Sequence, residues 1–283
     1  MILVTGATGT VGQELMRRLP RALAVRAMTR DPSRLEGRAP GTDVVAGDYT
    51  DPASLDHALR GVRRAFLLTS RVGGDDDALF LRAARSAGVR HVVKVSAAGV
   101  ADEGADDLIT RWQRTTERLL MDSGMRWTVL RPRSFMSNAL SWATSIASEG
   151  VVRALYGTSV NACVDPGDVA AAAVCALTED GHEGRIHTLT GPQPISAVEQ
   201  TAELGRVLGR PLRFEELSPD RARACLRERH PVEIVEALLA SAERQRAGAK
   251  AGVEDTVLRL TGRPARRFCA WAEDHREVFR RRP

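Results

Sequence analysis

Three glycines near the start of the chain have a spacing that could form a phosphate-binding turn. The stretch VTGATGTVG places Gly6, Gly9 and Gly12 between an apolar run and an amphipathic one. Gly6 can leave a strand sharply, Gly9 lets the backbone approach a pyrophosphate, and Gly12 lets the next helix pack closely. The N–H groups and positive dipole at that helix start attract an anion. The pattern predicts a dinucleotide-binding turn, and the alternative is a tight glycine turn that binds nothing.

Further residues predicted to contact the dinucleotide lie beside these glycines or just after later strands. Threonine and serine hydroxyls can donate hydrogen bonds to phosphate oxygens, as can backbone N–H groups in a first helical turn. The predicted set is Thr8, Thr10 and Val11 in the first turn, Leu68, Thr69 and Ser70 after the fourth expected strand, and Ser96 after the fifth. The nicotinamide ring is expected near VSAAG, residues 95–99.

The end of the second expected strand bears on the choice between NAD and NADP. An acidic residue there binds the ribose 2′-hydroxyl of NAD, whereas an arginine pairs with the 2′-phosphate of NADP. Arg30 falls at this strand end and is followed by Asp31 and Pro32, so Asp31 is better suited to cap a short helix. NADP(H) is therefore favoured over NAD(H), and an inward-facing Asp31 would reverse the preference. Asp48, after the third strand, is placed to reach the adenine edge or to serve as a turn residue.

The elements that must position these residues alternate between strand and helix. Alternation with short turns predicts βαβ units and a parallel sheet covered by helices on both faces. We predict an α/β protein with a Rossmann-type doubly wound parallel sheet, residues 1–190, and a smaller, mostly helical substrate-binding cap, residues 191–283, with contributions from 132–160. Expected strands are 2–5, 23–28, 43–46, 65–69, 91–95, 126–130 and 184–191, with RPLRFEEL (210–217) as a possible edge strand. Expected helices are 11–19, 52–60, 77–87, 106–122 and 164–177.

Composition and charge indicate an ordinary soluble enzyme. The formal net charge is +5, but the arginines are interleaved with acidic residues, so no nucleic-acid surface is expected. No apolar stretch is long enough to span a membrane, and the chain starts directly with a strand-like run, so we expect no signal peptide and a cytoplasmic location. The four cysteines form no CxxC pair and are expected to be reduced, and no metal site is expected.

Several stretches together resemble the short-chain dehydrogenase/reductase superfamily, and more closely its atypical NmrA-like branch. That branch includes NAD(P)H-dependent quinone reductases and triarylmethane reductases, and also redox-sensing regulators without known catalysis. The resemblance covers almost the whole chain and implies a Rossmann fold that binds NAD(P). The matching stretches are VTGATGTVG, GDYTDPASL, ERLLMDSGMRWTVLRPRSFMSN, DPGDVAAAAVCAL, LTGPQPIS and LTGRPARRFCAWAEDH.

The resemblance fails at the general acid. Most members of the superfamily carry a Tyr-x-x-x-Lys pair on the helix after the fifth strand, where the tyrosine donates a proton and the lysine lowers its pKa. Aligned on Glu117, this chain has Ile109 at the tyrosine position. It has Gln113 at the lysine position, where reductases of the branch often carry histidine. Neither Tyr49 nor Tyr156 begins such a pair.

Hydride transfer without a general acid restricts the acceptor. Reducing a ketone makes an alkoxide, whose conjugate acid has a pKa of roughly 16, whereas reducing a quinone makes a phenolate of pKa about 10. The gap of ~6 units is worth roughly 8 kcal/mol, so an acid matters far less for quinones, conjugated enones or cationic dyes. We expect an NADPH-dependent reductase of a conjugated, quinone-like or aromatic small molecule. The alternative is a non-catalytic NADP(H)-sensing regulator that binds a protein partner.

The loop after the sixth expected strand supplies the candidate substrate wall. Residues 131–142 should cross the nicotinamide side, where Phe135, Met136, Asn138 and Trp142 could face a planar substrate. The alternative is an apolar helix face packed under the cap. The catalytic candidates are Ser96, which could hydrogen-bond a carbonyl oxygen or simply end its strand, and Gln113, which could donate through its amide but cannot supply a proton. The oligomeric state is open, with a homodimer as one option.

Overall fold

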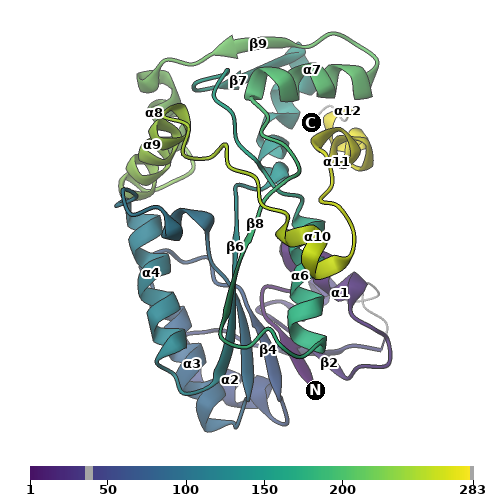
Figure 1. The fold of residues 1–283 in the computed structure, drawn as a ribbon, viewed down its shortest axis with the longest axis vertical. Helices are drawn as coiled ribbons and strands as arrows, with labels where there is room; N and C mark the ends of the chain where they lie inside the picture. Colours follow the sequence, from purple (N-terminus) through teal and green to yellow (C-terminus); the bar gives the residue numbers. More distant parts are fainter. Residues whose placement is uncertain (36–40, 281–283) are drawn as a thin grey trace. The chain divides into compact units, whose positions relative to one another are not determined.

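The computed structural model describes residues 1–35 and 41–280, and its main element is a seven-stranded sheet (Figure 1). The strands are β1 (Ile2–Val4), β2 (Val25–Thr29), β3 (Asp43–Ala46), β4 (Arg64–Leu67), β5 (His91–Val95), β6 (Arg126–Pro132) and β8 (Arg185–Leu189). Their order is β3-β2-β1-β4-β5-β6-β8, and neighbours from β3 to β6 run parallel. The order reverses between β1 and β4, which is where doubly wound sheets bind ligands.

Helices cover both faces of this sheet, as predicted (Figure 1). On one face α1 packs against α6. On the other face α2 packs against α3, and α4 adds a buried leucine to the same core. The bounds of these helices are α1 (Thr10–Arg18), α2 (Pro52–Leu59), α3 (Asp76–Ser86), α4 (Leu108–Met121) and α6 (Pro166–Thr178). The predicted doubly wound parallel fold is confirmed.

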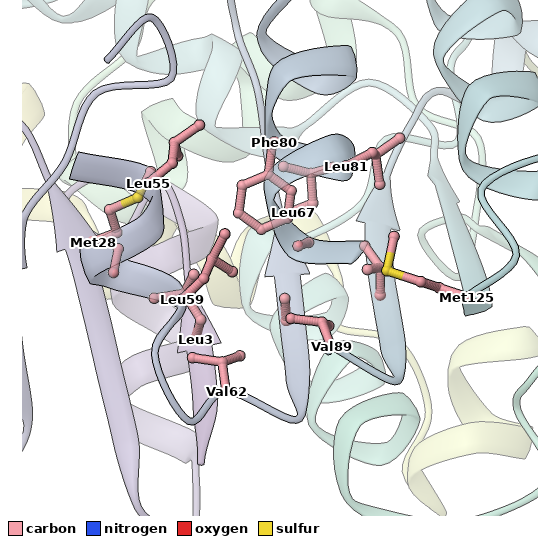
Figure 2. Close-up of a cluster of buried hydrophobic side chains, with 14 of the residues drawn as sticks. Leu3, Met28, Leu55, Leu59, Val62, Leu67, Phe80, Leu81, Val89 and Met125 are labelled. Carbon is pink, nitrogen blue, oxygen red and sulfur yellow. The ribbon is translucent and has the colours of Figure 1, made fainter. Parts of the chain in front are cut away.

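The core under α2 and α3 is made of aliphatic side chains with one aromatic ring at its centre (Figure 2). Phe80 of α3 is fully buried against leucines from the strands and from α2. Burying a side chain of this size stabilises the fold by about 1.5–3 kcal/mol. The cluster drawn in Figure 2 includes Leu3, Met28, Leu55, Leu59, Val62, Leu67, Phe80, Leu81, Val89 and Met125.

Local signals in the sequence place the element boundaries closely. Asp51 caps α2, since its side chain accepts a hydrogen bond from the Ala53 N–H at 3.0 Å, and Pro52 opens the helix. The strands and helices of the sheet begin and end within a few residues of their predicted limits.

Contacts between residues divide the chain into two compact units. Unit 1 holds residues 1–100, 110–132 and 166–188, and unit 2 holds 101–109, 133–165 and 189–283. The predicted domain boundary near residue 190 stays a prediction. Unit 2 contains a two-stranded parallel sheet of β7 (Val151–Ala154) and β9 (Arg213–Glu216), of which β7 was not predicted.

The rest of unit 2 is mostly helical, which confirms the prediction for the C-terminal region. Its own core joins Phe268, Trp271 and Phe279 to apolar residues between Met136 and Leu208. The helices are α5 (Ala143–Glu149), α7 (Ala197–Leu208), α8 (Pro219–Arg227), α9 (Val232–Arg246), α10 (Thr256–Thr261), α11 (Phe268–Asp274) and α12 (Arg276–Arg280), with a 3₁₀ segment η3 (Met136–Trp142).

Candidate cofactor site and active site

The turn between β1 and α1 has a shape that only glycine permits at two positions. Gly6 has a φ of +62°, which lies in the left-handed region that disfavours side chains. A Cβ at Gly12 would lie 2.1 Å from the Gly6 carbonyl oxygen and 2.8 Å from the Ala7 Cα. The helix can therefore start this close to the strand end only because residue 12 has no side chain.

The start of α1 is open to an anion. Gly9 is the N-cap residue and offers no side chain to the first-turn N–H groups, and the first turn carries no acidic residue. Thr8 is half-buried and Thr10 is exposed, so both hydroxyls lie near this helix end, while Val11 is buried beneath it. Free N–H groups, an uncompensated helix dipole and a missing Cβ fit a dinucleotide pyrophosphate.

The guanidinium at the end of β2 belongs to Arg30 and can contact a ligand. Asp31 is engaged as a cap, as predicted, because its Oδ1 accepts hydrogen bonds from the Ser33 N–H at 3.1 Å and the Ser33 hydroxyl at 2.6 Å. Arg30 is exposed and pairs with no carboxylate in residues 1–35 or 41–280. Its charge lies near enough to Asp48 to help lower the pKa of that carboxyl.

Asp48 is itself committed to a turn. Its Oδ1 accepts the Thr50 N–H at 2.8 Å and the Thr50 hydroxyl at 2.7 Å, and these two bonds are the main reason that its pKa lies below the usual value. The turn-residue alternative therefore describes its local contacts, and contact of Asp48 with an adenine stays a prediction.

The residues after β4 form one edge of the same turn. Leu68 contacts the position where Gly6 would carry a Cβ, at 3.4 Å, and its N–H donates to the Thr5 hydroxyl at 3.0 Å. Thr69 is buried and Ser70 is exposed. The structure thus brings Leu68 next to the glycine turn, as the predicted phosphate edge requires.

Ser96 follows β5 and holds an unused hydroxyl. It is 6% exposed, and its N–H donates to the Leu130 carbonyl at 2.7 Å. Its Oγ is buried and has no hydrogen-bond partner in the described part of the chain. A buried hydroxyl without a partner at a strand end is a natural place for a ligand oxygen.

A buried ion pair, which the sequence reasoning missed, lies beneath these strand ends. Lys94 of β5 is 0% exposed and donates to Asp77 at 2.6 Å, and Asp77 also accepts the Thr69 hydroxyl at 2.7 Å. The Lys94 ammonium lies 5.8 Å from the centre of the Trp112 ring. The signal was present in HVVKVS, because a lysine inside an apolar central strand requires a buried partner.

The helix that carries the superfamily's acid pair is α4, and the structure gives it no acid at those positions. Gln113 is 7% exposed, and its carbonyl side faces the Thr116 hydroxyl at 3.5 Å. Ile109 is half-buried.

The predicted substrate wall falls into different environments within unit 2. Met136 is 2% exposed and belongs to the unit 2 core, and Trp142 packs against that core. Phe135 is half-buried and forms a β-bridge with Val164, while Asn138 is exposed. The core-packing alternative describes Met136, and substrate contact by these four residues stays a prediction.

No helix in the described residues is both long and apolar enough to cross a bilayer.

Comparisons with known proteins identify relatives over the full length. A family model described as NAD(P)H-binding matches residues 6–180. The chain is 57% identical, over 99% of both chains, to a (4-alkanoyl-5-oxo-2,5-dihydrofuran-3-yl)methyl phosphate reductase of Streptomyces griseus. It is 36% identical, again over 99% of both chains, to an NAD(P)H azoreductase of Xenophilus azovorans.

Solved structures agree with these sequence relatives. An NADPH-dependent quinone oxidoreductase of Escherichia coli, in complex with NADPH, superposes with a TM-score of 0.83 at 29% identity, covering 97% of this chain and 99% of that one. The transcriptional regulator NmrA in complex with NADP shares the fold alone, at 19% identity and a TM-score of 0.76, covering 98% of this chain and 95% of that one. The predicted resemblance and NAD(P)H binding are confirmed, and so is the expectation of an enzyme. The chain belongs to the NAD(P)H-binding family, and these full-length relatives are named as reductases.

Proposed function

We propose that this protein is an NADPH-dependent reductase of a conjugated, electron-poor small molecule and that it works without a Tyr-Lys acid pair. The observation that carries the proposal is the replacement on α4. Ile109 and Gln113 occupy the acid-pair positions in a chain whose glycine turn is complete.

No tyrosine elsewhere replaces the missing acid. The Tyr49 hydroxyl donates to the Leu68 carbonyl at 3.0 Å, and burial raises the pKa of Tyr49 well above its usual value. Tyr156 donates to Glu243, and this hydrogen bond is the main reason that its pKa is also raised. Lys94 is fixed to Asp77 and cannot act as the lysine of such a pair.

The named substrate of the 57%-identical relative fits this chemistry, and we propose the same class for this chain. In a 4-alkanoyl butenolide the ring C3–C4 double bond is conjugated with the lactone carbonyl and with the alkanoyl carbonyl. Bound NADPH supplies a hydride to ring carbon C3 and is left as NADP⁺. The electron pair of the double bond moves to C4 and is shared with both carbonyl oxygens, and a proton from water then completes the new C4–H bond.

The side chains of this protein need only bind and orient the substrate in such a reaction, since the substrate itself delocalises the negative charge. The buried Ser96 hydroxyl is suited to donate a hydrogen bond to an enolate oxygen, and the Gln113 amide is suited to orient a carbonyl. Neither residue has to give up a proton. An alkoxide from a simple ketone would lack this delocalisation and would need the acid that is missing.

Preference for NADPH over NADH is part of the proposal. The exposed Arg30 guanidinium at the end of β2, which pairs with no carboxylate of the described residues, can take the 2′-phosphate through a bidentate contact. Asp31, the residue that would otherwise favour NAD, already caps the following turn through Ser33.

The test is NADPH consumption with three acceptor panels: alkanoyl butenolides, quinones, and simple ketones of similar size. The proposal expects turnover of a conjugated panel at least about 100-fold faster than of the ketones, because the acid's contribution of several kcal/mol matters only for the latter. Faster turnover of simple ketones would contradict it. NADPH binding without oxidation in any panel would favour the regulator alternative.

A further inference from the structure

A cluster of three cations lies within unit 2, around the residue that directly follows β6. Its members are Arg133, Arg244 and Lys250. Arg244 is neutralised, because it pairs with Asp107 at 2.7 Å and Asp102 at 3.6 Å. The other two cations have no such partner.

Arg133 and Lys250 hydrogen-bond only to neutral oxygens in residues 1–35 and 41–280. One Arg133 terminal nitrogen donates to the Ala249 carbonyl at 3.4 Å, and Lys250 donates to the Ser241 hydroxyl at 2.8 Å. The Arg133 Nε is buried and has no hydrogen-bond partner among the described residues. A buried guanidinium N–H without an acceptor indicates that an acceptor comes from outside the chain.

The electrostatic surroundings of the three cations also favour a bound anion. The pKa of Lys250 is lowered to about 8, mainly by burial and further by the nearby charges of Arg244 and Arg133, and only Asp107 opposes the shift. Burial also lowers the pKa of Arg133, against the effect of Asp102 and Glu254. Burial disfavours the charged forms of both residues, and neither forms a direct ion pair with a carboxylate among the described residues, so a bound anion would offset the cost of burial.

We propose that Arg133 and Lys250 bind the phosphate group of a phosphomonoester substrate, an inference that rests on the proposed function. A phosphomonoester carries a charge of about −1.5 to −2 at neutral pH. An arginine fork with a lysine point charge is a common pairing for it. Arg133 directly follows Pro132, the last residue of β6, in the chain. The 57%-identical relative is named for a phosphate ester.

The experiment compares a 4-alkanoyl-3-(phosphooxymethyl) butenolide with the same butenolide carrying a free hydroxymethyl group. For the wild-type protein we expect kcat/KM to be at least about 30-fold higher for the phosphate ester. Arg133→Gln and Lys250→Met should each lower kcat/KM for the ester by a similar factor, mainly through KM, and change the value for the alcohol less than about threefold. Lys250→Arg should retain most of the wild-type preference for the phosphate ester over the alcohol.

Arg246→Gln is the matched control, since Arg246 is exposed, pairs with Glu243 at 2.8 Å, and lies on the helix before Lys250. It should leave both substrates unaffected. Equal wild-type kcat/KM for ester and alcohol would overturn the inference and leave the proposed function standing. An equal loss on both substrates in the Arg133 and Lys250 variants would also overturn it.

A second measurement separates the two proposals and does not depend on turnover. Inorganic phosphate should raise the thermal unfolding midpoint of the wild type and of Arg246→Gln, but not that of Arg133→Gln or Lys250→Met. Where butenolides react, phosphate should inhibit competitively against the ester. If no butenolide reacts but phosphate still stabilises only the proteins that keep both cations, the proposed function fails and the anion site stands. If phosphate stabilises all four proteins equally, the site fails.

Discussion

Each unit contains one of the two lysines of this chain, and the electrostatic surroundings of the two lysines differ. Lys94 of unit 1 is fully buried against the carboxylate of Asp77, which is 1% exposed. Lys250 of unit 2 is half-buried, has a serine hydroxyl as its hydrogen-bond partner, and faces two arginines. The first charge is paired directly with a carboxylate, and the second is not.

This difference indicates which charge serves the fold and which is available for a ligand. A balanced buried pair leaves nothing for a ligand to neutralise, and removing one partner exposes the other to a medium that cannot solvate it. An unbalanced cation costs stability in the free protein and recovers it when an anion binds. Unit 1 should therefore respond to loss of its lysine by unfolding, and unit 2 by losing affinity.

The largest effect is expected from Lys94→Met. The substitution leaves Asp77 buried without its counter-charge, and such a loss typically destabilises a protein by about 3–5 kcal/mol. Urea unfolding monitored by circular dichroism gives the free energy of unfolding. Arg17→Met is the control, because Arg17 and Glu14 form a surface pair worth at most about 1 kcal/mol. A Lys94→Met protein as stable as the control would remove the contrast between the two lysines.

The next effect is on the cofactor turn of unit 1. Gly12→Ala places a Cβ against the backbone of Gly6 and Ala7, so the turn or the helix must shift. We expect NADPH to bind at least about 100-fold more weakly, which corresponds to roughly 2.7 kcal/mol. Titration of NADPH fluorescence measures the affinity. Gly252→Ala is the control, since nothing lies within 4 Å of its Cβ position, and it should bind NADPH like the wild type.

A smaller effect on the same cofactor should come from Arg30→Gln. Loss of a charge-assisted contact to the 2′-phosphate should weaken NADPH binding about 10- to 30-fold and leave NADH binding unchanged. The same titration with both coenzymes measures this ratio. An equal loss for NADPH and NADH would show that Arg30 does not read the 2′-phosphate.

The same contrast explains what could be predicted from the sequence. The cofactor turn is built by consecutive residues whose backbone geometry requires glycine, so Gly6, Gly9 and Gly12 identify it in one short stretch. The parallel sheet follows from the same kind of local pattern. The missing acid pair could also be predicted, because it depends on a fixed spacing along one helix.

The unit 2 features could not be predicted in this way. Arg133 and Lys250 lie far apart in the chain and share no motif, so only the tertiary structure brings them to one cluster. Met136 was predicted from the sequence as a possible pocket residue, and its position also depends on the tertiary structure. A hydrophobic residue after a strand end suits a pocket and a core equally well, and the structure places it in the core.

The smallest expected effect concerns the pH dependence that Lys250 confers. Its folded-state pKa of about 8 lies below the unfolded value of 10.5, so the unfolded chain binds more protons between these values and stability rises with pH there. Because the ammonium is half-buried, we expect this rise to amount to only about 1–2 kcal/mol. The charged groups that face the lysine are Arg133, Arg244 and Asp107. In Lys250→Met the rise in stability with pH should be absent, as measured by urea unfolding across the same pH range.

Inorganic phosphate should flatten the rise in stability of the wild type, because a bound dianion favours the charged lysine. A rise of equal size in Lys250→Met would assign the rise to another group and remove the electrostatic difference between Lys250 and Lys94.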